Sequence, residues 1–188
     1  MAIKQFNASY LAQEDRLLFR FNTVDDSEFR FWFTRRVTLF ILAATSHLII
    51  KNLEKVHAPE VAKAIDQFVN ESVTQAQKQA NEGKTEQYQS GGNYPLGAEA
   101  VLILDVKCNL EKKDKDDLLL MDFILPGGAN ITLSMAGPTL RAMCGLLNQL
   151  REHAAWGEIP ELNNEVKPIV AEGGENDTEM DSKKPQVH

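Results

Sequence analysis

The chain has 188 residues, a formal net charge of −7, 43% hydrophobic residues and 25% charged residues. This is the composition of an ordinary globular protein, and the length suits one domain with a tail or two very small domains. Two cysteines exclude a disulfide-stapled scaffold, and without a recognisable signal peptide the expected compartment is the cytoplasm.

The first part of the chain is predicted to form three strands. The first strand is expected at residues 3–11, followed by a turn at 13–15. Large apolar residues then alternate with polar ones over residues 17–22 and again over 28–34. A period of two is typical of strands with one buried face.

A helix is predicted to follow from Arg35 to about Lys55, with Thr34 as its N-cap. Its stretch 37–50 is strongly apolar but only fourteen residues long. A membrane-spanning helix needs about 20 apolar residues. We therefore expect a buried core helix and no membrane insertion.

A second helix is predicted to begin at Pro59, because proline suits the first position of a helix, and to end at Gly83. Its apolar residues recur with helical spacing: Val61, Ala64, Phe68, Val69, Val73 and Ala76. Residues 84–95 are polar and are predicted to be a linker.

The second half of the chain repeats the pattern of the first. A strand region is expected over 98–110, a charged turn over 111–117, a hairpin over 118–135, and a helix from Pro138 to about Gly157. The predicted fold class is therefore α+β: two pseudo-repeats of antiparallel β-β-β-α, at about 3–56 and 98–156, joined by an extra helix and a polar linker. We expect them to form one domain, 1–157.

The register of both hairpins follows from their apolar patterns, because paired residues face the same side of a sheet. Each hairpin is then left with a three-residue loop, 24–26 in the first copy and 126–128 in the second. The predicted pairs are Phe21 with Phe29, Phe19 with Phe31, Phe123 with Ile131, and Met121 with Leu133.

The first register gives the candidate site. It sets Arg20 opposite Arg30, and Leu18 opposite Trp32, on the face away from the phenylalanines. Like charges paired across strands are destabilising, and cations at a helix N-terminus oppose the helix dipole. These placements suggest a nearby anion. The candidate residues for binding nucleic acid or another anion are Arg20, Arg30, Trp32, Arg35 and Arg36.

A structural explanation competes with this hypothesis. Arg20 and Arg30 can pair with Glu28, Asp15 or a carboxylate of the tail, and Trp32 can lie under a helix. The matching outward positions of the second copy are not basic: Asp122, Thr132, Leu120 and Ser134.

The sequence offers no motif for catalysis. Residues 83–85 end like a phosphate-binding loop, but the earlier glycine of that motif is replaced by Lys78. Histidines and cysteines lack metal-ligand spacing. We expect a non-enzymatic protein with no cofactor and no metal.

Two repeats of strands followed by a helix, with ends such as residues 130–140, resemble the Whirly and Pur-type single-stranded nucleic-acid-binding proteins. The resemblance covers about 3–156 and implies a curved sheet in each repeat, a helix behind it and nucleic acid across the sheet. The resemblance supplies no binding residues; those come from the register.

Residues 158–188 hold eight Asp or Glu and three Lys and are predicted to be an acidic disordered tail that competes for the arginines. The predicted function is cytoplasmic binding of single-stranded nucleic acid through an arginine and tryptophan sheet face. The alternative is a protein-interaction or assembly component, with a homo-oligomer or another protein as partner.

Overall fold

The computed structural model describes residues 3–82, 87–113, 116–135 and 137–162. The predicted α+β class is confirmed, and the β-β-β-α order is visible in both halves. The elements are β1 (Ile3–Leu11), β2 (Arg16–Thr23), β3 (Glu28–Thr34), α1 (Arg35–Leu53), α2 (Pro59–Glu82), β4 (Val101–Leu102), β5 (Asp105–Lys113), β6 (Asp116–Ile124), a 3-10 turn (Pro126–Gly128), β7 (Asn130–Met135) and α3 (Gly137–His153).

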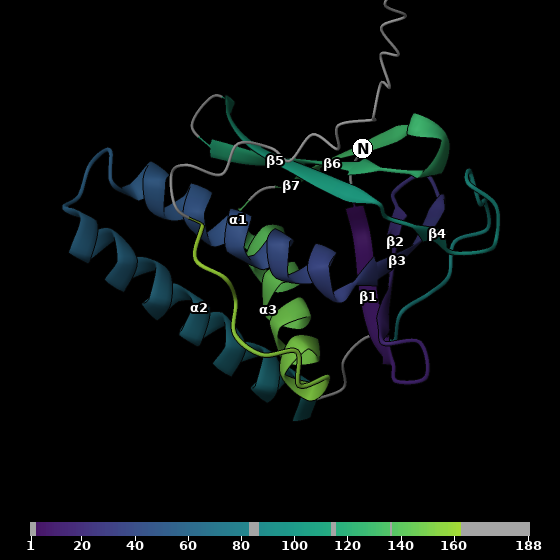
Figure 1. Ribbon diagram of the computed structural model, residues 1–188, viewed down its shortest axis with the longest axis horizontal. Coiled ribbons are helices and arrows are strands. Elements are labelled where there is room, and N and C mark those ends of the chain that lie inside the picture. The colour runs from purple at the N-terminus through teal and green to yellow at the C-terminus, as the bar shows by residue number, and fades with distance from the viewer. Residues whose placement is uncertain (1–2, 83–86, 114–115, 136, 163–188) are drawn as a thin grey trace, which may run out of the picture.

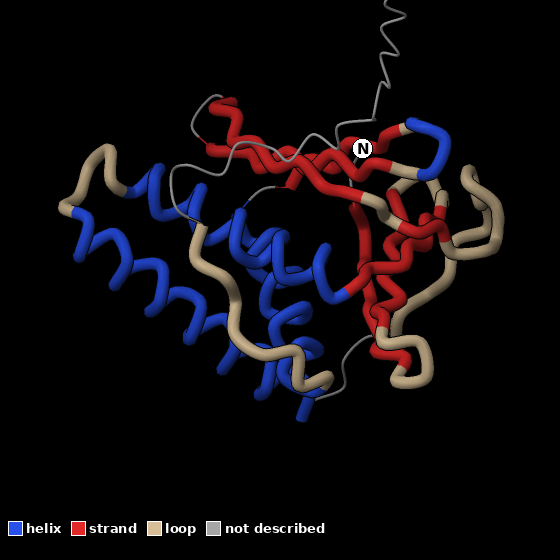
Figure 2. The backbone as a smooth tube through the Cα atoms, in the orientation of Figure 1, coloured by secondary structure: helices blue, strands red, loops and turns tan. Residues whose placement is uncertain are grey.

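The two copies form two separate sheets, one ordered β1-β2-β3-β4 and the other β5-β6-β7. Figure 1 shows the second sheet above α1, with α2 and α3 beyond it, while the first sheet stands beside the helices. Helices and strands therefore occupy different sides of the molecule (Figure 2).

Both predicted registers are confirmed. Phe19 pairs with Phe31 and Arg20 with Arg30 between β2 and β3. Met121 pairs with Leu133 between β6 and β7. The loop after Leu125 needs glycine, because Gly127 adopts φ +82°, which other residues rarely do.

The predicted strand region at 98–110 is wrong as one strand. Val101–Leu102 pairs in parallel with β3 of the first sheet, and β5 begins only at Asp105. Between them, the Ile103 N–H donates to the Trp32 carbonyl at 3.1 Å and the Leu104 N–H to that of Ile124 at 2.9 Å. The chain thus passes from one sheet to the other here, which an uninterrupted apolar run cannot reveal.

The charged turn predicted at 111–117 is also too long. Strand β5 continues to Lys113 and β6 begins at Asp116, so the cross-strand ladder extends through most of that turn.

The core lies where the two sheets meet. Five phenylalanines of β2 and β3 are buried on the inner face: Phe19, Phe21, Phe29, Phe31 and Phe33. The ring of Phe123 on β6 meets those of Phe31 and Phe33 edge-on, with centroids 5.4 Å away in each case. This aromatic contact joins the two repeats.

Helix α1 is the core helix that the sequence predicts. Thr34 caps it by accepting a hydrogen bond from the Val37 N–H at 3.3 Å. By length and composition α1 could cross a membrane, a test that the core helix of a soluble protein also passes. Its buried residues are Val37, Thr38, Ile41, Leu42, Ala43, Ala44 and Thr45.

Helix α2 has the predicted start, but part of its apolar pattern faces outward. Phe68 is 70% exposed and Val61 is 47% exposed, whereas Ala62 and Asp66 are buried. Gly83, its predicted end, lies outside the described residues, as do residues 163–188 of the predicted tail. Residues 158–162 form a loop after α3.

The junction of the sheets predicts a large loss of stability for Phe123→Ala. Removing a buried ring leaves a cavity, so we expect the free energy of unfolding to fall by about 3–5 kcal/mol. Urea denaturation measures it. The matched control is Phe68→Ala on the exposed side of α2, with an expected change within about 0.5 kcal/mol. Equal losses for both variants would contradict this placement of the core.

Candidate nucleic-acid interface

The outer face of the first sheet carries the candidate site. Because strands alternate, the residues between the buried phenylalanines all point away from the core. We call this surface the arginine face; it comprises Gln5, Asn7, Leu18, Arg20, Asn22, Glu28, Arg30 and Trp32. The structure therefore brings three of the five predicted residues together, Arg20, Arg30 and Trp32.

Glu28 provides Arg30 with an anion from within the chain. The Glu28 side chain is 0% exposed, and its Oε1 accepts from Arg30 Nε at 2.7 Å. This hydrogen bond is the main cause that raises the pKa of Arg30. Of the partners expected from the sequence, Asp15 instead accepts from Tyr10 and Trp156.

Residues 87–99 form an irregular segment that crosses the end of the arginine face at Asn22 and Glu28, and we call it the crossing segment. The Tyr88 ring lies 4.6 Å from the Arg20 guanidinium, and the Tyr94 ring lies 4.8 Å from that of Arg30. Both distances suit cation–π attraction. Each arginine of the like-charged pair thus has an aromatic neighbour, which lowers the cost of placing them side by side.

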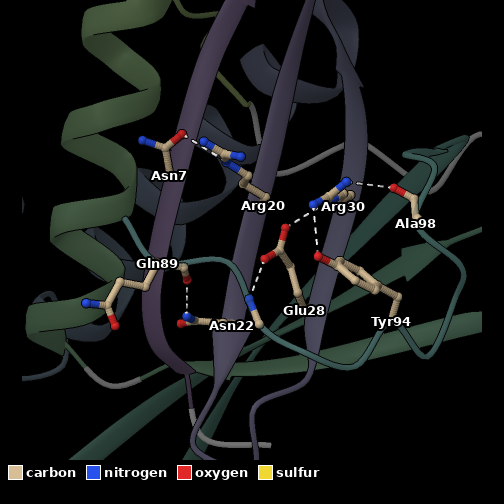
Figure 3. Close-up of polar contacts among 9 residues, drawn as sticks. Asn7, Arg20, Asn22, Glu28, Arg30, Gln89, Tyr94 and Ala98 are labelled. Atoms are coloured by element: carbon tan, nitrogen blue, oxygen red, sulfur yellow. Dashed lines mark hydrogen bonds and ion pairs between the residues drawn. The ribbon is translucent and has the colours of Figure 1, made fainter. Parts of the chain in front are cut away.

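Hydrogen bonds fasten the crossing segment to the sheet. Glu28 Oε2 accepts from the Gly91 N–H at 2.7 Å, and Asn22 Nδ2 donates to the Gln89 carbonyl at 2.7 Å. Arg30 donates to the Ala98 carbonyl at 2.9 Å. Figure 3 shows these contacts converging on β2 and β3.

Gly91 is required by this close approach. A Cβ at that position would lie 2.7 Å from the carbonyl oxygen of Asp26, nearer than real Cβ atoms come. The sequence predicts a polar linker at 84–95, and the described part of it, residues 87–95, is indeed irregular in conformation. These residues are nevertheless held against the sheet by hydrogen bonds and form part of the site.

Arg20 is the less neutralised of the two arginines. Its Nε donates to Asn7 Oδ1 at 3.3 Å, and within the described parts of the chain no carboxylate lies within ion-pair distance. Its remaining guanidinium donors can reach a ligand.

Trp32 lies next to this cation on a half-buried apolar strip. It pairs with Leu18 of β2 on one side and with Leu102 of β4 on the other. Trp32 remains half-buried, so the strip presents aromatic surface to solvent.

Arg35 and Arg36 lie at the start of α1, beyond the end of β3. Arg36 donates to the Leu104 carbonyl and lies 3.7 Å from Asp105, with 71% of its side chain exposed. Arg35 is also exposed. In the described chain neither makes a hydrogen bond or ion pair with Glu28 or Arg30, so they are at most a rim of the arginine face.

Three important residues of this surface were missed by sequence reasoning: Glu28, Tyr88 and Tyr94. Glu28 was weighed only as a partner for the arginines, whereas it also holds the crossing segment. The tyrosines lie in a region with no hydrophobic period, so no pattern places them on the sheet. The usable signal was the pair of glycines between them, which permits close approach of backbone.

The outer face of the second sheet differs, as its sequence predicts. Asp122 accepts a hydrogen bond from Thr132 at 2.5 Å, and no basic pair occurs in that register. Across the described ranges, no group of three or more His, Cys, Asp or Glu could hold a metal ion.

Comparisons with protein-family models, with curated proteins and with solved structures returned no match. The resemblance to Whirly and Pur-type proteins therefore stays a prediction.

Loss of Arg30 is predicted to destabilise the protein strongly. Arg30→Ala would leave the fully buried Glu28 carboxylate without its cation, a change that typically costs about 3–5 kcal/mol. Thermal and urea unfolding measure the change. The control is Arg36→Ala, whose exposed ion pair with Asp105 is worth at most about 1 kcal/mol. A similar small effect for both variants would show that Glu28 does not depend on Arg30.

The raised pKa of Tyr88 leads us to expect that the protein loses stability at high pH. Burial, followed by the nearby Glu28 charge, raises the pKa of Tyr88 above its usual value of about 10. Folding therefore favours the neutral phenol. Above about pH 10 the phenol ionises more readily in the unfolded chain, so the free energy of unfolding falls as pH rises. We expect urea midpoints to fall less between pH 8 and pH 11 in Tyr88→Phe than in the wild type. Parallel declines would contradict this.

Proposed function

We propose that this protein binds single-stranded nucleic acid on the arginine face. The observation that carries the proposal is Arg20, a half-buried cation with no carboxylate partner in the described chain, placed diagonally across from Trp32 on the same sheet face. Phosphate contact by arginine and stacking of bases on aromatic rings are the two interactions that proteins use for single strands.

The arrangement divides the work among the residues. Arg20 would contact phosphate, because its donors are less occupied than those of Arg30. Trp32 would stack a base, since Leu18 and Leu102 hold it at the middle of the strip. Arg30 would act mainly by positioning the face, because Glu28 already compensates its charge.

Charge supports a local rather than a global attraction. The whole chain carries −7, so binding must come from a small basic surface. Its salt dependence should be shallow, because the slope scales with the number of phosphates contacted. The one carboxylate of the arginine face, Glu28, is fully buried beneath the crossing segment. A strand passing over Arg20 and Trp32 would meet little negative charge from the face itself.

Fluorescence anisotropy of labelled single-stranded DNA and RNA tests the proposal at low and moderate salt. We expect Arg20→Ala to weaken binding and to reduce the salt slope by about one phosphate contact. Arg20 is the residue to change, because its removal orphans no buried carboxylate. Lys107→Ala, an exposed cation of β5, is the matched control and should bind as the wild type does.

Tryptophan fluorescence supplies a second readout. Trp156 is 2% exposed and makes an edge contact with Tyr10, so it is shielded from a ligand. In a Trp156→Phe variant, Trp32 is the sole tryptophan, and base stacking should quench it. No salt-dependent binding at low salt, or unchanged binding by Arg20→Ala, would overturn the proposal.

A role in assembly is the second candidate, favoured by the exposed side of α2. Phe68 and Val61 lie there with Ala64 and Ile65, and together they line an open apolar hollow. Large exposed apolar side chains at interfaces often anchor a partner. Sedimentation velocity at two concentrations tests it: a dimer lost in Phe68→Ser supports assembly through α2, and a monomer at both concentrations contradicts self-association.

A further inference from the structure

A second site lies among the three helices. A cavity of about 160 Å³ forms where α1, α2 and α3 meet, and the loop after α3 contributes Ile159 to its wall. A cavity of this volume is close to those that hold a single six-membered ring. Its apolar lining comes from every helix: Leu42, Ile49, Val73 and Leu140.

One part of this cavity is charged and buried. Asp66 on α2 is 2% exposed, and its Oδ2 accepts from Ser46 Oγ at 2.9 Å and from Asn70 Nδ2 at 3.2 Å. Its other oxygen, Oδ1, has no hydrogen-bond partner in the described residues. One oxygen of a buried carboxylate at the cavity wall thus lacks a hydrogen bond within the part of the chain that the structure describes.

Arg141 on α3 faces that oxygen. Its Nη1 lies 3.6 Å from Asp66 Oδ1, and this Nη1 atom likewise makes no hydrogen bond within the described chain. This separation is too long for a direct hydrogen bond. A buried acceptor and a buried donor therefore stand side by side, both available to a third molecule.

The chemistry of the two groups selects the ligand. A carboxylate only accepts hydrogen bonds and a guanidinium only donates them, so a ligand must offer a donor next to an acceptor. The charges of Asp66 and Arg141 cancel, and a charged ligand would bring in a charge without compensation. The apolar walls favour a flat or aliphatic body behind the polar edge.

We infer that this cavity binds a compact neutral molecule with an amide edge, in which an N–H lies beside a C=O. The N–H donates to Asp66 Oδ1 and the C=O accepts from Arg141 Nη1. The ring or short chain behind them contacts Ile49, Val73 and Ile159.

The cavity is reached from the surface and is separate from the arginine face. The Arg141 side chain is 22% exposed and Ile159 is 37% exposed, so its mouth lies along α3. None of the residues that line the cavity belongs to the arginine face or to the crossing segment, although α3 also contacts β1. This inference is therefore independent of nucleic-acid binding.

Methyl NMR of the isoleucine-labelled full chain tests the inference with uracil, a six-membered ring with amide edges. Saturable shifts are expected for Ile49 and Ile159 but not for Ile65, which lines the hollow on the other side of α2. Benzene and cyclohexanol, similar in ring size but without an amide edge, should bind at least tenfold more weakly.

Two variants tie the shifts to the cavity. Asp66→Asn keeps the shape of the side chain and should weaken uracil binding at least tenfold, while Asp105→Asn, which changes a 54% exposed side chain, should not. Val73→Phe should abolish the shifts by filling the cavity, with Asp66 intact. The chemical-shift dispersion of each variant reports folding.

Three results would overturn the inference. The first is the absence of saturable shifts at Ile49 and Ile159 with uracil. The second is equal binding of benzene or cyclohexanol, which would make the cavity an apolar hole or an alcohol site. The third is unchanged uracil affinity in both a folded Asp66→Asn and a folded Val73→Phe protein.

Discussion

The pairing register of β2 with β3 constrains both the core and the candidate site. With Phe19 opposite Phe31, every second residue of each strand enters the core, and Arg20 must stand opposite Arg30 on the other side. A slip of one residue would expose the phenylalanines and bury the arginines, so the register is strongly specified. The like-charged pair is thus a consequence of core packing that the rest of the face must accommodate.

Glu28 is the main group that makes the like-charged pair of arginines tolerable. Its carboxylate is fully buried and receives Arg30 on one oxygen and the Gly91 N–H on the other. One group therefore compensates a charge and fastens the crossing segment, which in turn brings Tyr88 over Arg20. This explains why the face remains more basic at Arg20 than at Arg30. The Glu28 carboxylate neutralises only Arg30, whereas Arg20 has an aromatic ring as its neighbour.

The sequence predicts those features that depend on local periodicity. The hairpin registers, the three-residue loops and the start of α1 follow from alternation, turn residues and the Thr34 cap. The passage of residues 103–104 between sheets could not be predicted, because a buried crossover and a continuous buried strand have the same apolar composition. Tyr88 and Tyr94 were missed for a related reason, since irregular segments carry no period.

The cavity was beyond sequence reasoning because it needs three helices at once. Asp66 and Arg141 are 75 positions apart, and nothing local marks Asp66 as buried or Arg141 as its neighbour. Helical period shows only that Asp66 and Phe68 point in different directions from α2. Which of the two directions is inward depends on α1 and α3, whose placement is set by the two sheets.

Helix α2 therefore has an unusual distribution of side chains. It buries a carboxylate at Asp66 and exposes an aromatic ring at Phe68, the reverse of the ordinary preference. Such departures from local rules are expected where a protein meets a partner, since the bound molecule can recover what the free chain gives up. On one side a small ligand would supply the hydrogen bonds that Asp66 Oδ1 and Arg141 Nη1 lack in the described chain. On the other a protein surface would cover Phe68.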